Sequence, residues 1–352
     1  MLTHCNLILP TNNFYKSLFG KTKLDFTFTR IRKIQQYIMG KKIAVVGAGI
    51  SGLSSTYKLV EAGHRVTVFA KQFSPNITSN RAAAFWFPFH TRNDKRGIAW
   101  SNAAYEFFKT MSENEATGIS FKKLVKMIRE ELTPEKPVWL DFLPQGIFRT
   151  MQASELKPGY GTAYEIEVPL IETQIFLPYL QNWLAQKGVQ FIEQEIKDLN
   201  ELIADYEVVI NCSGFGSRAL CNDEELIPVR GQVVLLSPKP DFNLYIDNES
   251  ALYVVPRKDA IIVGGTYQQN IFEEITVAGD LDYILEKAFS VFPELKEQTI
   301  IGNWAGLRPF REKVRLEREA GTNIIHNYGH GGSGFTLSFG CAEEVKNLVE
   351  NF

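Results

Sequence analysis

Two glycine clusters stand out because each precedes a stretch in which apolar residues recur at helical spacing. The first, GAGISG at positions 47–52, follows a short apolar run at 42–46. The second, GGSG at positions 331–334, follows a predicted strand at 324–330. Glycine lets a backbone turn tightly and approach a ligand closely, and the free N–H groups of a helix N-terminus attract anions. The chemistry that both clusters favour is therefore the binding of phosphate or another anionic group.

The first cluster has the surroundings that a dinucleotide site needs. The pattern predicts a strand over Lys42–Val46, a helix that ends at Gly63, and a second strand over Arg65–Phe69. G-x-G-x-x-G between such elements binds a pyrophosphate. NAD sites usually carry an acid after the second strand, and none follows Phe69 here. Lys71 could contact ribose or phosphate instead, or simply be a solvated lysine.

The second cluster argues for a long ligand. A mononucleotide needs one helix N-terminus, whereas two fit a ligand that is anionic at both ends, such as FAD. The first helix would hold the pyrophosphate. The second would face the flavin edge that becomes negative on reduction, where the helix macrodipole stabilises charge.

Composition is that of an ordinary globular protein. The chain has 352 residues, which suggests two domains, with 45% hydrophobic and 22% charged residues and a net charge of −2. We expect no nucleic-acid partner and no membrane span, while a homodimer stays open. The four cysteines form no C-x-x-C pair, and the C-terminus lacks a peroxisomal Ser-Lys-Leu-type tail. A reducing compartment, the cytoplasm, is the expectation.

Residues 1–38 differ in composition from the rest of the chain. They hold six Lys or Arg against one acid, and a second methionine, Met39, stands just before the first predicted strand. We expect 1–38 to be a loose extension or an over-long reading frame, with a transit peptide as the alternative.

The remaining pattern predicts an α/β fold. Helices are expected over Ile98–Thr110, Ser120–Glu131 and Thr173–Lys187, and strands dominate after Val229. We expect a Rossmann-like FAD-binding domain that is discontinuous in sequence, with a mixed-sheet substrate domain. The predicted FAD-binding pieces are 39–90, 160–225 and 300–352, and the predicted substrate-domain pieces are 91–159 and 226–299.

The motifs together resemble the D-amino-acid oxidase family, which includes D-aspartate oxidase. The segment 324–342 fits the family's signature pattern. Further matches are VVINCSGFGSRAL (208–220), VRGQVV (229–234), YVVP with GGTYQ (253–268) and GLRPFREKVRLERE (306–319). They span nearly everything from Met39 to Phe352.

The resemblance implies noncovalent FAD and oxidative deamination. A D-amino acid would give a 2-oxo acid and ammonia, and oxygen would give hydrogen peroxide. The family's carboxylate-binding arginine falls on Arg308, its substrate tyrosines on Tyr253 and Tyr267, and its amine-binding region on Gly332. A guanidinium grips a carboxylate with two parallel hydrogen bonds, and a tyrosine adds a donor and an apolar wall. The expected FAD contacts are Gly47, Ala48, Gly49, Ile50, Ser51, Gly52, Lys71, Ser79, Ala83, Ser213, Gly214, Gly331, Gly332, Ser333, Gly334, Phe335 and Thr336.

No residue is expected to act as an acid or base. His330 would shape the flavin loop, His326 would be structural, and His90 could approach the pocket. No Ser/His/Asp set or metal cluster stands out. A flavin that accepts hydride from a neutral amine leaves binding and orientation to the protein.

Three departures from the family concern the substrate. Phe87 replaces a polar glutamine of animal members, 247–251 is too short for a large lid, and no second arginine is evident. Neutral, apolar D-amino acids are therefore expected, unless Arg81 points into the pocket. D-aspartate oxidase, glycine oxidase and a quinone-linked dehydrogenase stay open, with a non-catalytic flavin-binding module as the remote alternative.

Overall fold

The computed structural model describes residues 40–88, 95–132, 137–247 and 249–352. The chain divides into two compact units, Met1–Lys41 and Lys42–Phe352, and the second holds every strand and helix of the described residues. The expectation for residues 1–38 lies outside the described residues. Within these limits, no helix is both long and apolar enough to cross a membrane.

Parallel strands form one half of a single sheet, in the order β14-β7-β1-β2-β6. The strands are β1 (Lys42–Val46), β2 (Arg65–Ala70), β6 (Gln190–Glu193), β7 (Val208–Asn211) and β14 (Ile324–His330). Short runs rich in β-branched residues suit this position, because a parallel sheet is covered on both faces. The predicted strands of this half are confirmed.

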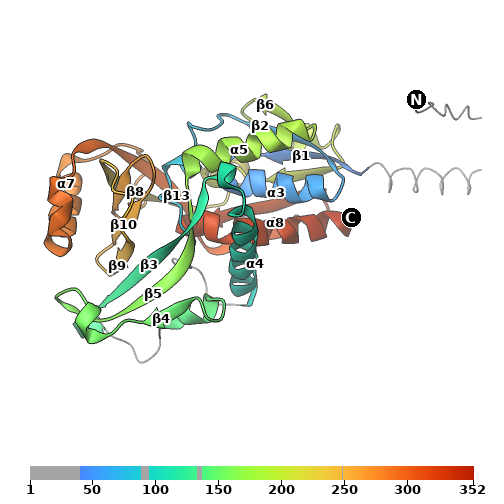
Figure 1. Cartoon of the computed structure of the whole chain (residues 1–352). Coiled ribbons are helices and arrows are strands. Elements are labelled where there is room, and N and C mark those ends of the chain that lie inside the picture. Colours follow the sequence, from blue (N-terminus) through green and yellow to red (C-terminus); the bar gives the residue numbers. More distant parts are fainter. Residues whose placement is uncertain (1–39, 89–94, 133–136, 248) are drawn as a thin grey trace, which may run out of the picture. The chain divides into compact units, whose positions relative to one another are not determined.

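Helices cover this half of the sheet (Figure 1). They are α3 (Ile50–Glu61), α4 (Lys95–Met111), α5 (Thr173–Gln186) and α8 (Gly334–Glu350). Helix α3 packs against α5 and α8, and α4 packs against α8. At Gly340 of α8 a side chain would overlap the backbone of Trp100 in α4, so a glycine is needed for this close approach.

The other half of the sheet is mixed and mainly antiparallel, in the order β4-β5-β3-β9-β10-β11-β8-β13. Its strands are β3 (Ile119–Arg129), β4 (Phe148–Thr150), β5 (Tyr160–Ile171), β8 (Ile227–Leu236), β9 (Leu244–Asp247), β10 (Leu252–Pro256), β11 (Ile261–Gly264) and β13 (Ile300–Arg318). Helix α7 (Ala278–Val291) packs against β8, β10 and β11. Strand β13 pairs with both β8 and β14, and thereby joins the two halves.

Short elements complete the described chain. They are β12 (Gln268–Gln269), α6 (Ser217–Leu220), and 3-10 turns of which η1 (Thr78–Arg81) and η9 (Gly331–Ser333) lie at the candidate site.

One predicted helix is wrong. Residues Ser120–Glu131 were expected to be helical, but β3 runs through Ile119–Arg129 and pairs with β5 along almost its whole length. Residues 124–128 of the strand are buried on both faces: Leu124 packs into the largest core cluster, and Val125 and Met127 pack into the second. A strand buried on both faces shows no alternation of apolar and polar residues, which is why the pattern misleads.

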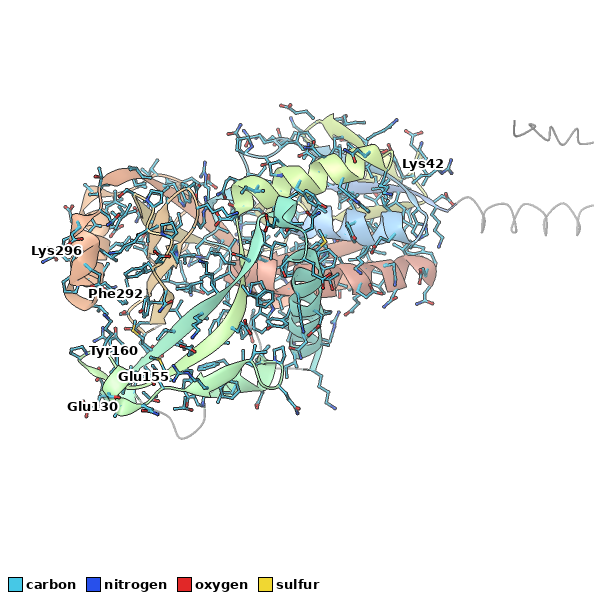
Figure 2. All side chains as sticks on the ribbon, in the orientation of Figure 1. Lys42, Glu130, Glu155, Tyr160, Phe292 and Lys296 are labelled. Atoms are coloured by element: carbon cyan, nitrogen blue, oxygen red, sulfur yellow. The ribbon has the colours of Figure 1, made fainter. Side chains whose placement is uncertain are left out.

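Three core clusters hold the unit together, and the smallest includes Val46 and Phe69. The largest runs from the helices of the parallel half to one face of the mixed half, where it includes Val233 and Ile246. The second lies under α7 and includes Tyr160 and Phe292, which Figure 2 shows on the same side of the molecule, far from Lys42. One sheet and one large cluster span both halves, so neither marks a boundary between domains. The predicted domain boundaries therefore stay a prediction.

Candidate active site

The turn between β1 and α3 accepts only glycine at two positions. Gly47 has φ +113°, and a Cβ there would overlap the carbonyl oxygen of Cys212. A Cβ on Gly52 would overlap the carbonyl oxygen of Gly47. The Gly47 N–H donates to the carbonyl oxygen of Phe69 at 2.7 Å, which fixes the turn against β2. These contacts bring the start of α3 close to the carboxyl ends of β1 and β7.

The N-terminus of α3 is left open for an anion. Its N-cap residue Gly49 has no side chain with which to cap the helix, and its first turn holds no acid. The N–H of Ile50 donates to the Ser79 hydroxyl from η1 at 3.0 Å. Free N–H groups at a helix start carry a partial positive charge, so this end suits a pyrophosphate.

A second open helix start lies beside the first. Helix α8 begins at Gly334 with no side-chain cap and no acid in its first turn. A Cβ on Gly334 would lie 3.6 Å from Cγ2 of Ile50, and the Ser51 hydroxyl donates to the carbonyl oxygen of Asn327 at 2.9 Å. The two glycine clusters, almost 300 residues apart in sequence, therefore meet. Two adjacent helix N-termini with no acid of their own fit an extended anionic cofactor.

Arg308 lies on β13 with its guanidinium over a glycine. A Cβ on Gly231 of β8 would overlap the guanidinium, and Nη1 of Arg308 donates to the carbonyl oxygen of Thr266 at 3.1 Å. The side chain is half-buried and forms no ion pair with any described carboxylate. A cation withdrawn from water without a partner acid is costly, so the site is built to receive an anion.

Two tyrosines lie close enough to Arg308 for its charge to affect their pKa values. The ring of Tyr253 lies over Gly264, where a Cβ would overlap it. Burial raises the pKa of the Tyr253 hydroxyl, and the neighbouring Arg308 opposes part of the rise. Burial likewise raises the pKa of Tyr267, against a hydrogen bond with Gln269 and the charge of Arg308. The structure thus brings the predicted residues Arg308, Tyr253 and Tyr267 together, with both hydroxyls protonated at neutral pH.

Three other arginines near the mixed sheet each form an ion pair with an acid. Arg81 donates to Glu274 at 2.6 Å and to the carbonyl oxygen of Ala305 at 2.8 Å. Nη2 of Arg230 lies 3.9 Å from Oδ2 of Asp280, and Nη2 of Arg257 lies 2.5 Å from Oδ2 of Asp259. Of these four arginines, Arg308 is the one that forms no ion pair with a described carboxylate, so its charge is available to a ligand.

The first turn of α8 also positions an apolar residue. The Thr336 hydroxyl donates to the carbonyl oxygen of Phe87 at 2.8 Å and accepts from the Phe87 N–H at 3.3 Å. The buried Phe87 ring packs against Trp139, with the ring centroids 5.5 Å apart. Phe87 therefore offers a ring, and no polar group, beside the second helix start.

The other residues predicted to contact FAD are spread over several parts of the fold. Ser213 donates to Oδ1 of Asn211 at 2.7 Å at the end of β7, Gly214 has φ +58°, and Ala83 is half-buried. Lys71 is exposed and pairs with Glu195 at 3.2 Å. Their contacts to FAD stay a prediction.

The histidines are held by neighbours. His330 contacts Oδ1 of Asn327 at 3.1 Å, and burial lowers its pKa to about 4, so it is neutral at pH 7. His326 is buried against Glu319. His90 lies outside the described residues. The described residues hold no cluster of three or more metal-ligating side chains.

Sequence reasoning missed the glycines that make room for the site. Gly231 and Gly264 lie on adjacent strands, and Thr266 accepts from Arg308. The only signal was glycine inside strand-like sequence, which marks a close approach.

Comparison with known proteins gives a consistent picture. Residues 42–348 match the family model described as "FAD dependent oxidoreductase". A D-amino-acid oxidase from Dictyostelium discoideum is 33% identical over 88% of this chain and 91% of its own length. A human D-aspartate oxidase is 31% identical over 88% of this chain and 94% of its own length. The structure of a glycine oxidase from Bacillus cereus has a TM-score of 0.76 at 19% identity, covering 88% of this chain and 97% of that one.

Proposed function

The chain belongs to the family of FAD-dependent oxidoreductases that includes the D-amino-acid oxidases, and from this premise we propose that it prefers D-amino acids with neutral, apolar side chains. It is an FAD-dependent enzyme that deaminates D-amino acids oxidatively, with oxygen as co-substrate. The products are a 2-oxo acid, ammonia and hydrogen peroxide.

The observation that carries the binding of an amino acid is the guanidinium of Arg308, which has no carboxylate partner among the described residues. An α-carboxylate placed over Gly231 would complete the missing ion pair with two parallel hydrogen bonds. The protonated hydroxyl of Tyr253 can donate to the same carboxylate. Backbone groups around Gly332, in the turn before α8, would hold the amine.

The chain's own part in the reaction is binding and orientation. When bound, FAD would supply the acceptor for the α-hydrogen and its electron pair, and the route of these electrons to oxygen. Arg308 and the Gly332 turn fix the carboxylate and the amine, so the α-hydrogen of only one enantiomer can face the flavin. His330 is neutral and bonded to Asn327, so it is not poised to move a proton. Holding the reactants in one geometry supplies a large part of the rate.

The apolar preference rests on the walls of the site. Phe87 and Trp139 present rings, and the charges of Arg81 and Arg257 are already matched by acids. A side-chain carboxylate would therefore lose its water without gaining a cation. The runner-up functions are D-aspartate oxidase, glycine oxidase and a quinone-linked dehydrogenase.

A peroxide assay separates these functions. Purified holoenzyme is given D-methionine, D-aspartate, glycine and L-methionine in air, and peroxide, ammonia and 2-oxo acid are measured together. We expect equal amounts of the three products from D-methionine. Turnover of D-methionine that needs a quinone and yields no peroxide would favour the dehydrogenase. A cytoplasmic location and a homodimer stay predictions.

Tyr253→Phe should still turn over. The hydroxyl is protonated because burial raises its pKa, so it can donate to the substrate but is not a base at neutral pH. Loss of one hydrogen bond to a charged group should raise KM by about 10-fold or somewhat more. The check is stopped-flow flavin reduction at saturating D-methionine. A fall of more than about 10³-fold would instead assign Tyr253 to proton abstraction.

Gly231→Ala should displace Arg308. The new Cβ would overlap the guanidinium, the flexible end of the arginine must move, and kcat/KM should fall about 10-fold while FAD stays bound. Gly302→Ala is the matched control, because nothing lies within 4 Å of a Cβ there. Equal kcat/KM in the two variants would show that the position of Arg308 over Gly231 is not used.

A further inference from the structure

Outside the flavin site, three side chains form a chain of contacts from a thiol to a carboxylate. Sγ of Cys221 lies 3.8 Å from Nδ1 of His326. Nε2 of the same ring lies 2.9 Å from Oε2 of Glu319. A nucleophile, a base and a group that orients the base in this order form the arrangement that activates a thiol. Nothing in the oxidase reaction uses these residues.

Neighbouring polar groups fix the tautomer of the imidazole. The Asn211 amide lies 3.4 Å from Nδ1 of His326 and can only donate to it, so Nδ1 carries the lone pair. Nε2–H then donates to Glu319. The same Asn211 amide donates to the Cys221 sulfur at 3.2 Å. The hydrogen bond from Asn211 to Nδ1 is long, at 3.4 Å, so the lone pair can exchange it for the thiol proton.

Both partners start neutral at pH 7. Burial raises the pKa of the Cys221 thiol and the charge of Glu319 adds to the rise, whereas the Tyr328 hydroxyl and the charge of Arg315 oppose part of it. Burial and Arg315 lower the pKa of His326, against the pull of Glu319. A neutral imidazole beside a thiol is a base that takes the proton as the sulfur reacts, rather than half of a standing ion pair.

The thiol also has access to solvent. Cys221 is half-buried and lines an open surface hollow of about 420 Å³, together with the cations Arg311 and Arg315 and the acids Asp223, Glu224 and Glu225. The cysteines Cys212 and Cys341 are buried, at 4% and 0% exposed. Burial raises the pKa of each of those thiols, and neither contacts an imidazole. Cys221 thus differs from them in its access to solvent and in having a base within reach.

We propose that Cys221 is a modification site: a peroxide-reactive thiol that the enzyme's own product oxidises, with His326 as the base. The thiol proton moves to Nδ1 of His326, and the sulfur attacks one oxygen of hydrogen peroxide. The O–O bond breaks, and the departing hydroxide takes the proton from His326 and leaves as water. The sulfur loses two electrons and becomes a sulfenic acid, and the peroxide is reduced.

The charges around the thiol support this step. The guanidinium of Arg315 donates to the Tyr328 hydroxyl at 2.8 Å and pairs with Glu317 at 2.9 Å; its charge still lowers the pKa of the Cys221 thiol, which favours negative charge on the sulfur. Glu319 holds the imidazole in the required tautomer and stabilises the imidazolium that forms. The inference rests on the proposed function only for the source of the peroxide.

The test uses full-length holoenzyme, dimedone as the sulfenic-acid probe and mass spectrometry of the cysteine peptides. One arm adds hydrogen peroxide without substrate, so it does not depend on oxidase activity. A second arm adds D-methionine in air, with and without catalase. We expect dimedone on Cys221 in both arms, suppressed by catalase, and at least 10-fold faster than on Cys212 or Cys341.

Variants separate activation from mere exposure. His326→Asn should slow the labelling of Cys221 by about 100-fold, within the range for loss of a general base, and Glu319→Gln should slow it several-fold. Glu319 is 41% exposed, so its variant should fold even if His326→Asn does not. Glu286→Gln on α7 removes an exposed carboxylate elsewhere and should leave the labelling rate unchanged. Cys221 labelled no faster than Cys212, or at the wild-type rate in Glu319→Gln, would overturn the proposal.

Discussion

Arg308→Ala should lower kcat/KM for D-methionine by at least about 10- to 150-fold while FAD stays bound. The range follows from the 1.5–3 kcal/mol that a hydrogen bond to a charged group contributes. Arg308 has no described carboxylate partner, so its removal leaves the substrate carboxylate without a cation. The measurement is steady-state kinetics together with the flavin absorbance of each purified variant.

The matched control is Arg81→Ala. This arginine pairs with Glu274 across the surface and bonds to the backbone at Ala305, so its loss should change kcat/KM less than threefold. A change of less than threefold in Arg308→Ala would remove Arg308 from the site. A large fall in Arg81→Ala would instead place that arginine in the substrate pocket.

D-methionine should exceed D-aspartate in kcat/KM by about 100-fold or more. Burying a second carboxylate without a partner costs several kcal/mol, and about 1.4 kcal/mol corresponds to a factor of ten. Arg308 would be engaged by the α-carboxylate, and the apolar wall around Phe87 offers no charge. Side-by-side peroxide assays at equal enzyme concentration give the ratio. A higher value for D-aspartate would mean that a second cation lines the pocket.

The ion pair between Arg81 and Glu274 supports the expected preference for D-methionine. Arg81 was the cation that could have reversed the expected preference. Its guanidinium lies against Glu274 and Ala305, so it has partners of its own. Glu274→Gln would release Arg81 from its acid. If that variant gained activity on D-aspartate, the neutrality of the pocket would depend on this one ion pair.

The nucleotide-binding half could be predicted from the sequence because its signals are local. A buried strand, a glycine turn and a helix follow each other directly at 42–61 and again at 324–350, and both predictions are confirmed. The meeting of the two helix starts could not be predicted. It depends on β1, β7 and β14 being neighbours in the sheet, which no short segment encodes.

The mixed half was harder because its elements lack a clear period. Strand β3 is buried on both faces over residues 124–128 and was wrongly expected to be a helix, while β5 and β13 were not predicted as strands. Residues of the candidate site depend on this register. Gly231 lies under Arg308 because β8 and β13 pair with Gly231 opposite Gly306, and this pairing depends on the whole sheet. The same holds for Cys221 and His326, which are 105 residues apart.

The most direct test of the account is the flavin spectrum of the purified protein under anaerobic conditions. We predict bound FAD whose visible absorbance bleaches on addition of D-methionine and returns on addition of oxygen, with one equivalent of hydrogen peroxide per flavin. L-methionine should leave the spectrum unchanged, because its α-hydrogen would point away from the flavin. A flavin that stays oxidised with every D-amino acid, or that L-methionine bleaches equally fast, would contradict the account.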